Sequence, residues 1–575
     1  YKHVAENSNT LNKQHKKILE NKLRDFKLSG VDLADSEKNE FKDLSSEISM
    51  LANKFTNNVM DCTDQWTYHI KDYDNNPQQV SDILAGIPED IISLAASRSK
   101  DANQKGWIFG LDAPTYLAIM KYAKNREVRA AFHFAYTTRS SIHGPHDAKF
   151  DNEQIIYDLL DKKYKLAKML GFNNIAEYSL ATKMVRDPRE VLEFLNNLVT
   201  KVKKIAEHEW QELQLFAKRH DGIENLKPWD IAYYSEIQKN ELYSLSDNKL
   251  KSYFPLQKVL SGFFTIVKKL YNVSLEIHSS ADTWHPDVEC YKVVKNSKTI
   301  GYVYLDLFAR LKKRNGAWMD ECRVRCFTDN IQQIPVAYLT CNFTPPDSKG
   351  LALLTYTEVT TLFHEFGHCL HHLLTEVDYP SISGINGVPW DAVELPSQFH
   401  ENWCWSKESI NYISGHYQTG EPLPDKVLQQ LIKQKNYQSA IFLLRQLIFG
   451  LYDFRLHLEF HPDNDSNQVT DILSEVRKQI AVLPYADYDY FPHSFSHIFA
   501  GGYSAGYYSY LWADVLSANC FDRFKKTDIF DQNTSLEFLH KILSQGGGID
   551  ISEAMRDFCR GEIRLEPLLE HYGVK

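Results

Sequence analysis

The sequence predicts a mainly α-helical protein with one small β-sheet, and three observations carry this prediction. Apolar residues recur at helical spacing from residue 11 to about residue 275, and they do so again after residue 350. Between about 285 and 345 the pattern changes to runs rich in β-branched and aromatic residues. A chain of 575 residues exceeds one ordinary hydrophobic core, so we expect two lobes or a large two-part unit.

The first half of the chain is expected to consist of helices. Residues 11–61 have the spacing of long helices, and a clear helix start follows at Asp187, which can cap the helix that Pro188 begins. Residues 302–307 and 336–339 are then the expected strands, on either side of the turn-like Arg314-Asn315-Gly316. No repeat, low-complexity tract or long linker follows, so we expect several chain crossings between the lobes.

The helix expected after residue 350 carries the most informative motif. Its apolar stripe runs through Val359, Leu362, Phe363, Phe366, Leu370, Leu373 and Leu374. His364 and His368 lie one turn apart on another side of that helix, so both imidazoles can reach one metal ion. Glu365 is rotated by about 100° from His364 and faces the same opening. Gly367 lowers helix propensity by roughly 1 kcal/mol relative to alanine, which suggests a close approach to the backbone there.

A catalytic zinc ion takes three protein ligands and leaves a fourth position for water. Glu394 is the predicted third ligand, and it follows a loop-like run with two glycines. Asp391 or Glu358 is expected to orient a ligand imidazole through its free ring nitrogen. Pro396 requires the helix around Glu394 either to start near Asp391 or to be bent.

Tyr503, Tyr507 and Tyr510 are spaced i, i+4 and i+7, so on a helix their phenols share one side, just after Gly501-Gly502. Neutral phenols can donate to the oxyanion formed in amide hydrolysis, and His497 can add another donor. The spacing alone is more typical of core packing, and this is the role expected for Tyr508.

These residues belong to blocks that resemble the thimet oligopeptidase family of zinc peptidases, and most closely its bacterial oligopeptidases. The similar blocks are 316–320, 335–343, 363–370, 391–398, 401–403, 495–503 and 507–512. The resemblance implies an elongated, two-lobed helical metallopeptidase with a deep central channel, a small β-sheet near the active site and one Zn²⁺ per chain. It also implies that His497, Tyr503, Tyr507 and Tyr510 contact substrate or stabilise the transition state, with Tyr510 the first choice for the oxyanion.

The expected function is zinc-dependent hydrolysis of internal bonds in short unfolded peptides, with Glu365 as general base and then acid. One alternative is a dipeptidyl carboxypeptidase of the same superfamily, and another is a peptide-binding protein without chemistry. A structural zinc protein is a third alternative, although such sites usually have four Cys or His ligands.

The composition limits the partners that the protein can bind and the compartment in which it is expected. A formal charge of −10 argues against nucleic acid, and no run of about 18 apolar residues suggests a membrane span. Short basic runs such as Lys312-Lys313-Arg314 are interpreted as solvated loop charges. Nine cysteines without a CxxC pair indicate reduced thiols, so a cytoplasmic location is expected. We also expect the protein to be a monomer.

Two regions are expected along the chain. Residues 1–125 form an N-terminal helical region, and residues 126–575 form the zinc metallopeptidase catalytic region. Family members carry further N-terminal residues that this chain lacks, so one wall of the channel is expected to be incomplete.

Overall fold

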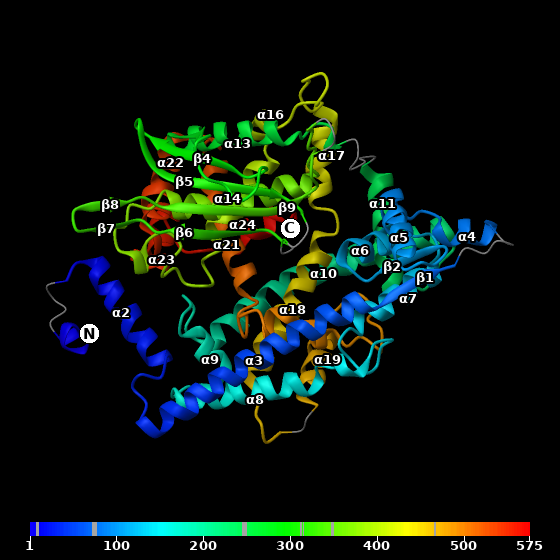
Figure 1. The fold of residues 1–575 in the computed structure, drawn as a ribbon, viewed down its shortest axis with the longest axis horizontal. Coiled ribbons are helices and arrows are strands. Elements are labelled where there is room, and N and C mark those ends of the chain that lie inside the picture. Colours follow the sequence, from blue (N-terminus) through cyan, green and yellow to red (C-terminus); the bar gives the residue numbers. More distant parts are fainter. Residues whose placement is uncertain are drawn as a thin grey trace.

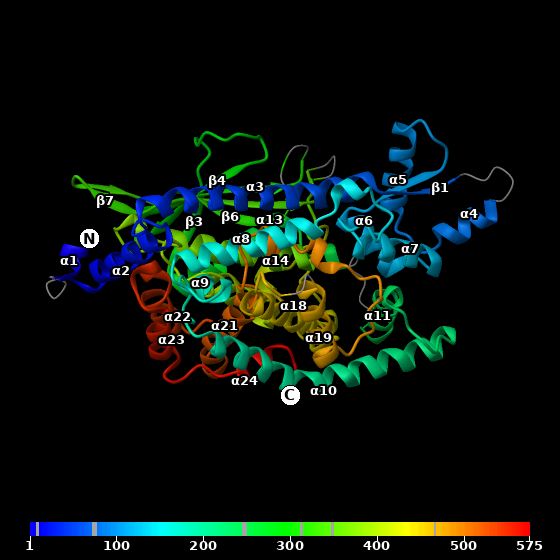
Figure 2. The same ribbon diagram turned by 90° about the horizontal axis from the view of Figure 1, so that it is seen from below.

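The computed structural model describes residues 1–6, 11–71, 77–243, 250–310, 313, 316–346, 350–464 and 467–574. Within these residues the fold is mainly helical and contains one five-stranded sheet (Figure 1), as the sequence predicts. Two large hydrophobic cores divide most of the molecule into a sheet lobe and a helical lobe. The molecule is elongated in both views, and the N-terminal helices lie at one end of it (Figure 2).

The sheet lobe is built around the five-stranded sheet, whose strand order is β3-β4-β5-β9-β6. Its strands are β3 (Val273–Ile277), β4 (Glu289–Lys295), β5 (Lys298–Phe308), β9 (Val336–Phe343) and β6 (Trp318–Arg323). The two predicted strands therefore exist, and β5 and β9 pair in parallel with Tyr302 opposite Val336. β6 pairs antiparallel with β9 and is an edge strand. A separate hairpin joins β7 (Cys326–Thr328) to β8 (Ile331–Gln333).

Helices complete the core of the sheet lobe. They are α13 (Leu256–Tyr271), α14 (Tyr356–Leu373), α15 (Leu395–Glu401), α16 (Lys407–Ile413), α17 (Asp425–Lys435), α22 (Gln532–Lys541) and α23 (Ile551–Cys559). Buried apolar residues of α13 and α14 pack together, and Phe263 lies 4.7 Å from Phe363 and 4.5 Å from Phe366 between ring centroids. This packing fixes the side of α14 that carries the predicted apolar stripe.

One predicted loop charge is buried in this lobe. Lys313 is interpreted from the sequence as solvated, but its side chain is 6% exposed and its Nζ lies 2.8 Å from Asp306 Oδ1. The same Nζ donates to the backbone oxygens of Phe308 and Cys341. The solvated interpretation is therefore wrong for Lys313, because a buried carboxylate and two carbonyls take up its charge. Lys312, Arg314 and Asn315 lie outside the described residues.

The helical lobe contains no strand of the five-stranded sheet among its described residues, and long and short helices make up its core. They are α3 (Asp35–Gln65), α8 (Glu153–Met169), α9 (Ile175–Leu180), α10 (Pro188–Asp221), α18 (Ser439–Glu459), α19 (Gln468–Ile480), α20 (Ser496–Phe499) and α24 (Glu566–His571). Asp187 caps α10, as predicted, and its carboxylate accepts the N–H of Arg189 at 2.9 Å.

A smaller unit with its own core lies at one end of the molecule, at the right of Figure 1. It contains β1 (Thr67–Ile70), α4 (Pro77–Leu84), α5 (Glu89–Asp101), β2 (Trp107–Gly110), α6 (Ala113–Tyr122) and α7 (Arg126–Thr137). Helix α11 (Pro228–Tyr243) packs against α6 and α7. The N-terminal helices α1 (Lys2–Glu6) and α2 (Lys13–Leu28) lie near the opposite end (Figure 1).

Helix α21 (Ser509–Lys526) belongs to both lobes. Its Leu511 and Val515 lie in the core of the helical lobe, whereas Leu516 and Phe521 lie in the core of the sheet lobe. The two lobes are therefore joined by shared packing as well as by the chain. None of the helices in the described residues combines the length and the apolar character that a membrane crossing requires.

Candidate metal centre

Helix α14 is held in place at its start and along one side. The Thr355 side chain accepts the N–H of Glu358, and the Glu358 carboxylate accepts the N–H of Thr355 at 2.7 Å. This capping box stabilises the first turn. Val359, Leu362, Phe363, Phe366 and Leu370 are buried in the core of the sheet lobe. The predicted helix is confirmed, and its packing leaves His364 and His368 pointing away from the core.

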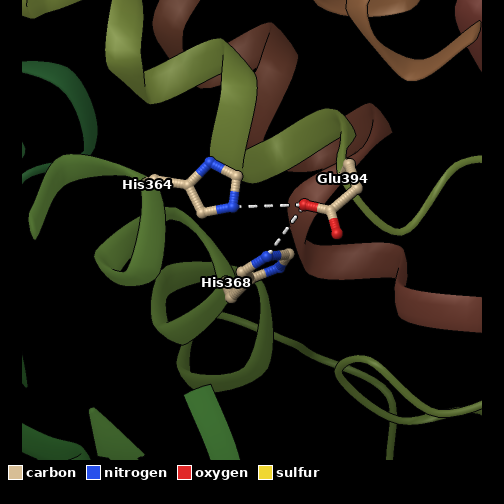
Figure 3. Close-up of side chains that lie close together, drawn as sticks. All are labelled: His364, His368 and Glu394. Atoms are coloured by element: carbon tan, nitrogen blue, oxygen red, sulfur yellow. Dashed lines mark ion pairs between the residues drawn. The ribbon is translucent and has the colours of Figure 1, made fainter. Parts of the chain in front are cut away.

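The two histidines and Glu394 form one cluster (Figure 3). Oε2 of Glu394 lies 3.2 Å from Nε2 of His364 and 3.2 Å from Nε2 of His368. The side chains of the three residues are 27%, 14% and 14% exposed, so the cluster is open to one side. The structure thus brings together the three residues that the sequence predicts as metal ligands, two from α14 and one from the residue just before the next α-helix.

Glu394 reaches this position because α15 lies directly against α14. Glu394 immediately precedes α15, and Pro396 lies in the first turn of that helix, where a missing N–H costs no hydrogen bond. A Cβ atom on Gly367 would lie 2.5 Å from Cα of Ser397 and 2.6 Å from the oxygen of Pro396. The close approach inferred from Gly367 is therefore present, and only glycine allows it. Oγ of Ser397 donates to Oε2 of Glu394 at 2.9 Å and steadies the carboxylate.

The carboxylate that orients His364 is Glu401, which the sequence analysis did not assign. Oε1 of Glu401 lies 2.7 Å from Nδ1 of His364. Its position one helix further along, at the end of α15, gave no spacing signal relative to His364. A carboxylate can only accept, so the proton of this hydrogen bond lies on Nδ1, and Nε2 is the ring nitrogen that faces Glu394.

The two orienting carboxylates predicted from the sequence have other roles. Asp391 is buried, and its carboxylate accepts the N–H groups of Met184 and Val185 and the hydroxyl of Tyr508. It therefore ties the two lobes together instead of binding an imidazole. Glu358 forms the capping box of α14. Both predictions are wrong because these carboxylates satisfy backbone donors next to them.

The electrostatics of the cluster favour charge on the ligands. Burial alone would lower the pKa of His364, but hydrogen bonds with Glu394 and Glu401 outweigh burial and raise that pKa well above its ordinary value. Burial would raise the pKa of Glu394, yet the two histidines hold it well below its usual range. The carboxylates therefore favour positive charge between the two imidazoles and Glu394. A divalent cation bound there supplies that charge.

Glu365 lies beside the cluster and is not one of its three converging groups. Its residue is only 6% exposed, and burial raises the pKa of its carboxyl above the usual value, against the charges of His364 and His368. A buried carboxylate with raised proton affinity next to a metal-binding cluster is suited to accept and return a proton.

The donor set fits a divalent transition metal ion. Two imidazole nitrogens and one carboxylate oxygen are the ligands that catalytic zinc sites use, with a position left for water. The three donor atoms lie close enough together to share one ion, and Glu401 supplies the second hydrogen bond that metal-bound histidines commonly make. The residues present therefore fit the predicted metal.

The three tyrosines do not share one helix. Residues 504–508 form turns, and only Tyr510 lies on α21, which begins at Ser509, so the helical arrangement considered for all three is wrong for Tyr503 and Tyr507. The rings still gather. Tyr510 lies 5.1 Å from Tyr503 and 5.5 Å from Tyr507 between ring centroids. Tyr508 is fully buried, which confirms its expected place in the core.

Asp453 on α18 explains why this turn is formed. Its fully buried carboxylate accepts the N–H groups of Ala505 at 2.9 Å and of Gly506 and Tyr507 at 2.8 Å. Three successive donors on one carboxylate fold the chain around it. Because a helix would direct these N–H groups along its own axis, the buried carboxylate overrides the helical pattern.

Two of the tyrosines lie near the metal-binding cluster. The charge of Glu394 contributes to the raised pKa of Tyr503 and of Tyr510, although burial is the main cause for both. Nε2 of Gln398 on α15 donates to the backbone oxygen of Tyr510 at 3.2 Å. Both phenols therefore stay protonated at neutral pH and can donate hydrogen bonds.

Tyr507 and His497 also belong to this group of rings. The hydroxyl of Tyr507 donates to Gln446 at 2.9 Å. The His497 ring lies 6.1 Å from the Tyr503 ring and 5.9 Å from the Tyr507 ring. Trp390, which the sequence analysis did not select, lies 5.4 Å from Tyr503 and is 43% exposed.

Comparison with known proteins agrees with this geometry. Oligopeptidase A of Escherichia coli is 47% identical over 569 residues, which cover 98% of this chain and 82% of that protein. Dipeptidyl carboxypeptidase of the same organism is 30% identical over 557 residues, with 96% and 79% covered. The solved structure of PZ peptidase A with an inhibitor matches with a TM-score of 0.52 at 14% identity, covering 98% of this chain and 84% of that one. This last likeness concerns the fold alone.

The sequence profile of peptidase family M3 matches residues 119–574, which include all residues of the metal-binding cluster and of the tyrosine group. The family resemblance recognised in the sequence is confirmed, and this chain belongs to peptidase family M3.

Proposed function

We propose that this protein is a zinc-dependent oligopeptidase that hydrolyses internal bonds of short unfolded peptides. One observation carries the proposal: two imidazole nitrogens and a carboxylate oxygen converge within 3.2 Å contacts, beside a buried carboxyl group on the same helix. The similarity to oligopeptidase A over nearly the whole chain supports internal cleavage.

His364, His368 and Glu394 would hold the one catalytic zinc ion of each chain, and Glu401 would keep His364 in the tautomer that presents Nε2. When bound there, zinc supplies positive charge that makes a water more acidic and a peptide carbonyl more electrophilic. Glu365 takes the proton of the attacking water, because its buried carboxylate has raised proton affinity. The same carboxyl group then gives that proton to the leaving amine nitrogen.

The tyrosine hydroxyls stabilise the oxyanion and position the peptide. Tyr510, near Glu394, donates its hydroxyl proton as a hydrogen bond to the carbonyl oxygen as negative charge develops on it. Tyr503 assists from its stacked position 5.1 Å away. Tyr507 and His497 position the peptide chain. The exposed edge strand β6 offers a row of backbone groups to which an extended peptide can add.

We also propose the substrates, the roles of the two chain regions and the compartment of the enzyme. Its substrates are short peptides, which a channel between the two lobes would admit while excluding folded proteins. Residues 126–575 carry the chemistry, and residues 1–125 cover the catalytic region from one side. The protein acts as a monomer in the cytoplasm and binds neither nucleic acid nor membrane.

A digest of short peptides tests this function. A peptide blocked at both ends should be cut at internal bonds, and a chelator should abolish the cutting until zinc is restored. Product masses distinguish the alternatives. Removal of C-terminal dipeptides only, and only from peptides with a free carboxyl end, would instead identify a dipeptidyl carboxypeptidase, to which a relative of that name lends support. Binding of all these peptides without any cleavage would identify a non-catalytic peptide-binding protein.

A further inference from the structure

A second group of possible metal ligands lies in the helical lobe, and the proposed function does not use it. Asp151 and Glu153 stand at the start of α8, and His493 lies in the short 3-10 helix Phe491–Ser494. One donor atom from each residue lies within 4.8 Å of the other two. Donor atoms that share one metal ion are separated by distances of this order, since each lies about 2 Å from the ion.

Two of these possible ligand atoms lack the hydrogen-bond partners that buried polar groups normally have. His493 is only 4% exposed, and its Nδ1 is buried without a hydrogen-bond partner. Oδ1 of Asp151 is likewise buried without a partner. Buried polar atoms without a partner are unfavourable, because they have lost their hydrogen bonds to water. The cluster therefore contains two possible ligand atoms without a hydrogen-bond partner, the ring nitrogen Nδ1 of His493 and the carboxylate oxygen Oδ1 of Asp151.

The surrounding hydrogen bonds hold the three residues in place. Nδ2 of Asn152, between the two carboxylates in sequence, donates to the backbone oxygen of His493 at 3.0 Å. Oδ1 of the same Asn152 accepts from Asn58 of α3 at 2.9 Å. Asn152 is fully buried, so the spacing between the start of α8 and His493 is fixed before any ligand binds. Preorganisation of this kind lowers the cost of binding an ion.

The charges near the cluster favour a cation. Two carboxylates contribute about two negative charges, against the roughly half positive charge at the N-terminus of α8. His143 stacks on Tyr490 at 4.1 Å between ring centroids, and the Tyr490 ring lies 5.5 Å from the His493 ring, so these rings pack beside the cluster. An imidazole with two carboxylates suits zinc and similar divalent transition metal ions.

We propose that Asp151, Glu153 and His493 form a second, structural site for a divalent transition metal ion. The ion would join the start of α8 to the segment that leads into α20, on which His497 lies. Water completes the coordination on the side of Glu153, which is exposed. The site would stabilise the helical lobe without taking part in peptide hydrolysis.

Metal counting tests this site independently of catalysis. The double variant His364→Ala/His368→Ala removes the catalytic ligands, and zinc per chain is measured by mass spectrometry after equilibration with buffered zinc. We expect two ions in the wild-type protein and one in the double variant. Adding Asp151→Asn and Glu153→Gln, which preserve side-chain size, should remove the remaining ion. Asp158→Asn, on the same helix, is the matched control and should leave it bound.

Thermal unfolding supplies a second readout that needs no activity. Zinc should raise the melting temperature of the His364→Ala/His368→Ala variant, and this rise should vanish when Asp151→Asn and Glu153→Gln are added. Equal zinc content and equal melting shifts with and without these two substitutions would overturn the proposal. Failure of the peptide digest would overturn the proposed function and leave this result unchanged.

Discussion

The hydrogen bond from His364 to Glu401 decides which ring nitrogen of that histidine faces Glu394. Nδ1 lies 2.7 Å from the Glu401 carboxylate, so Nε2 is the nitrogen left to face Glu394 and a metal ion. Glu401 does not belong to the group of converging donors, and it acts on the metal site through His364. A single side chain that does not itself bind the metal therefore fixes the orientation of His364 and raises the basicity of its metal-binding nitrogen.

Replacing Glu401 by glutamine should weaken metal binding. The amide keeps the size of the side chain but loses the charge that supports the imidazole, so zinc affinity should fall by about 10- to 100-fold. Competition with a coloured chelator measures this change. Glu408→Gln, an exposed carboxylate at the start of α16, is the control and should bind zinc as the wild type does. Unchanged affinity in Glu401→Gln would contradict the orienting role.

Tyr510→Phe tests the predicted oxyanion donor. Loss of one hydroxyl should lower kcat by about 10²- to 10³-fold with little change in KM, because the hydrogen bond strengthens only in the transition state. Zinc content should remain the same. Steady-state kinetics on a quenched peptide measure both constants, and the exposed Tyr417→Phe serves as the control. A change in KM alone would assign Tyr510 to substrate binding.

At the scale of elements, the contact between α14 and α15 positions the metal ligands. Gly367 lets the backbone at Pro396 and Ser397 approach α14 so closely that a methyl group would lie 2.5 Å from Cα of Ser397. Glu394 immediately precedes that segment, so the distance between the helices also sets the distance from its carboxylate to the two histidines.

Gly367→Ala should therefore damage the metal site as well as the fold. The added methyl forces α15 away, which overpacks the core and lowers the free energy of unfolding by about 1–3 kcal/mol. Zinc affinity should fall in the same variant because Glu394 moves with α15. Denaturant unfolding and metal titration measure the two effects. Gly561→Ala, where a methyl meets no neighbour within 4 Å, is the control. Wild-type zinc affinity in Gly367→Ala would contradict this coupling.

The sequence predicted those elements whose pattern is local. The stripe of α14, the strands 302–307 and 336–339 and the cap at Asp187 follow from spacing and capping chemistry, and all are present. The turn at Tyr503–Tyr508 was not predicted, because the carboxylate that folds it comes from Asp453, about fifty positions earlier. Nothing in the local pattern of the tyrosines reports a distant buried charge.

In the candidate site, too, some residues could be predicted from the sequence and others could not. His364 and His368 share a helix, so their common face followed from the sequence, whereas the placement of Glu394 rested on the need for a third ligand and is met by the structure. The orienting carboxylate could not be chosen, because Asp391, Glu358 and Glu401 are all plausible by distance along the chain. Only the three-dimensional contacts show that Asp391 joins the lobes and Glu358 caps α14.

At the scale of the whole molecule, two cores share α21 and meet at Asp391. The carboxylate of Asp391, three residues before Glu394, accepts N–H groups from Met184 and Val185 in the other half of the chain. The stability of the helical lobe and the geometry of the metal ligands are therefore linked. Any condition that loosens one lobe should also affect the site.

Acid should destabilise the molecule through buried neutral histidines. Burial lowers the pKa of His133 to about 4, whereas an unfolded histidine titrates near 6.5. The unfolded chain therefore binds a proton first as the pH falls, and stability is lost between about pH 6.5 and pH 4. His133 alone should cost about 2 kcal/mol at pH 5. Unfolding free energies of the wild type and His133→Gln at neutral pH and at pH 5 measure this term. Equal losses in both proteins would contradict it.

The measurement that bears most directly on the whole account combines metal content with turnover in Glu365→Gln. We predict that this variant keeps one zinc ion at His364, His368 and Glu394 and loses peptide cleavage by about 10³-fold or more, because the base is gone while the ligands remain. Glu394→Gln, the matched variant in the ligand set, should lose that zinc ion as well as cleavage. Near wild-type cleavage by zinc-loaded Glu365→Gln would contradict the account.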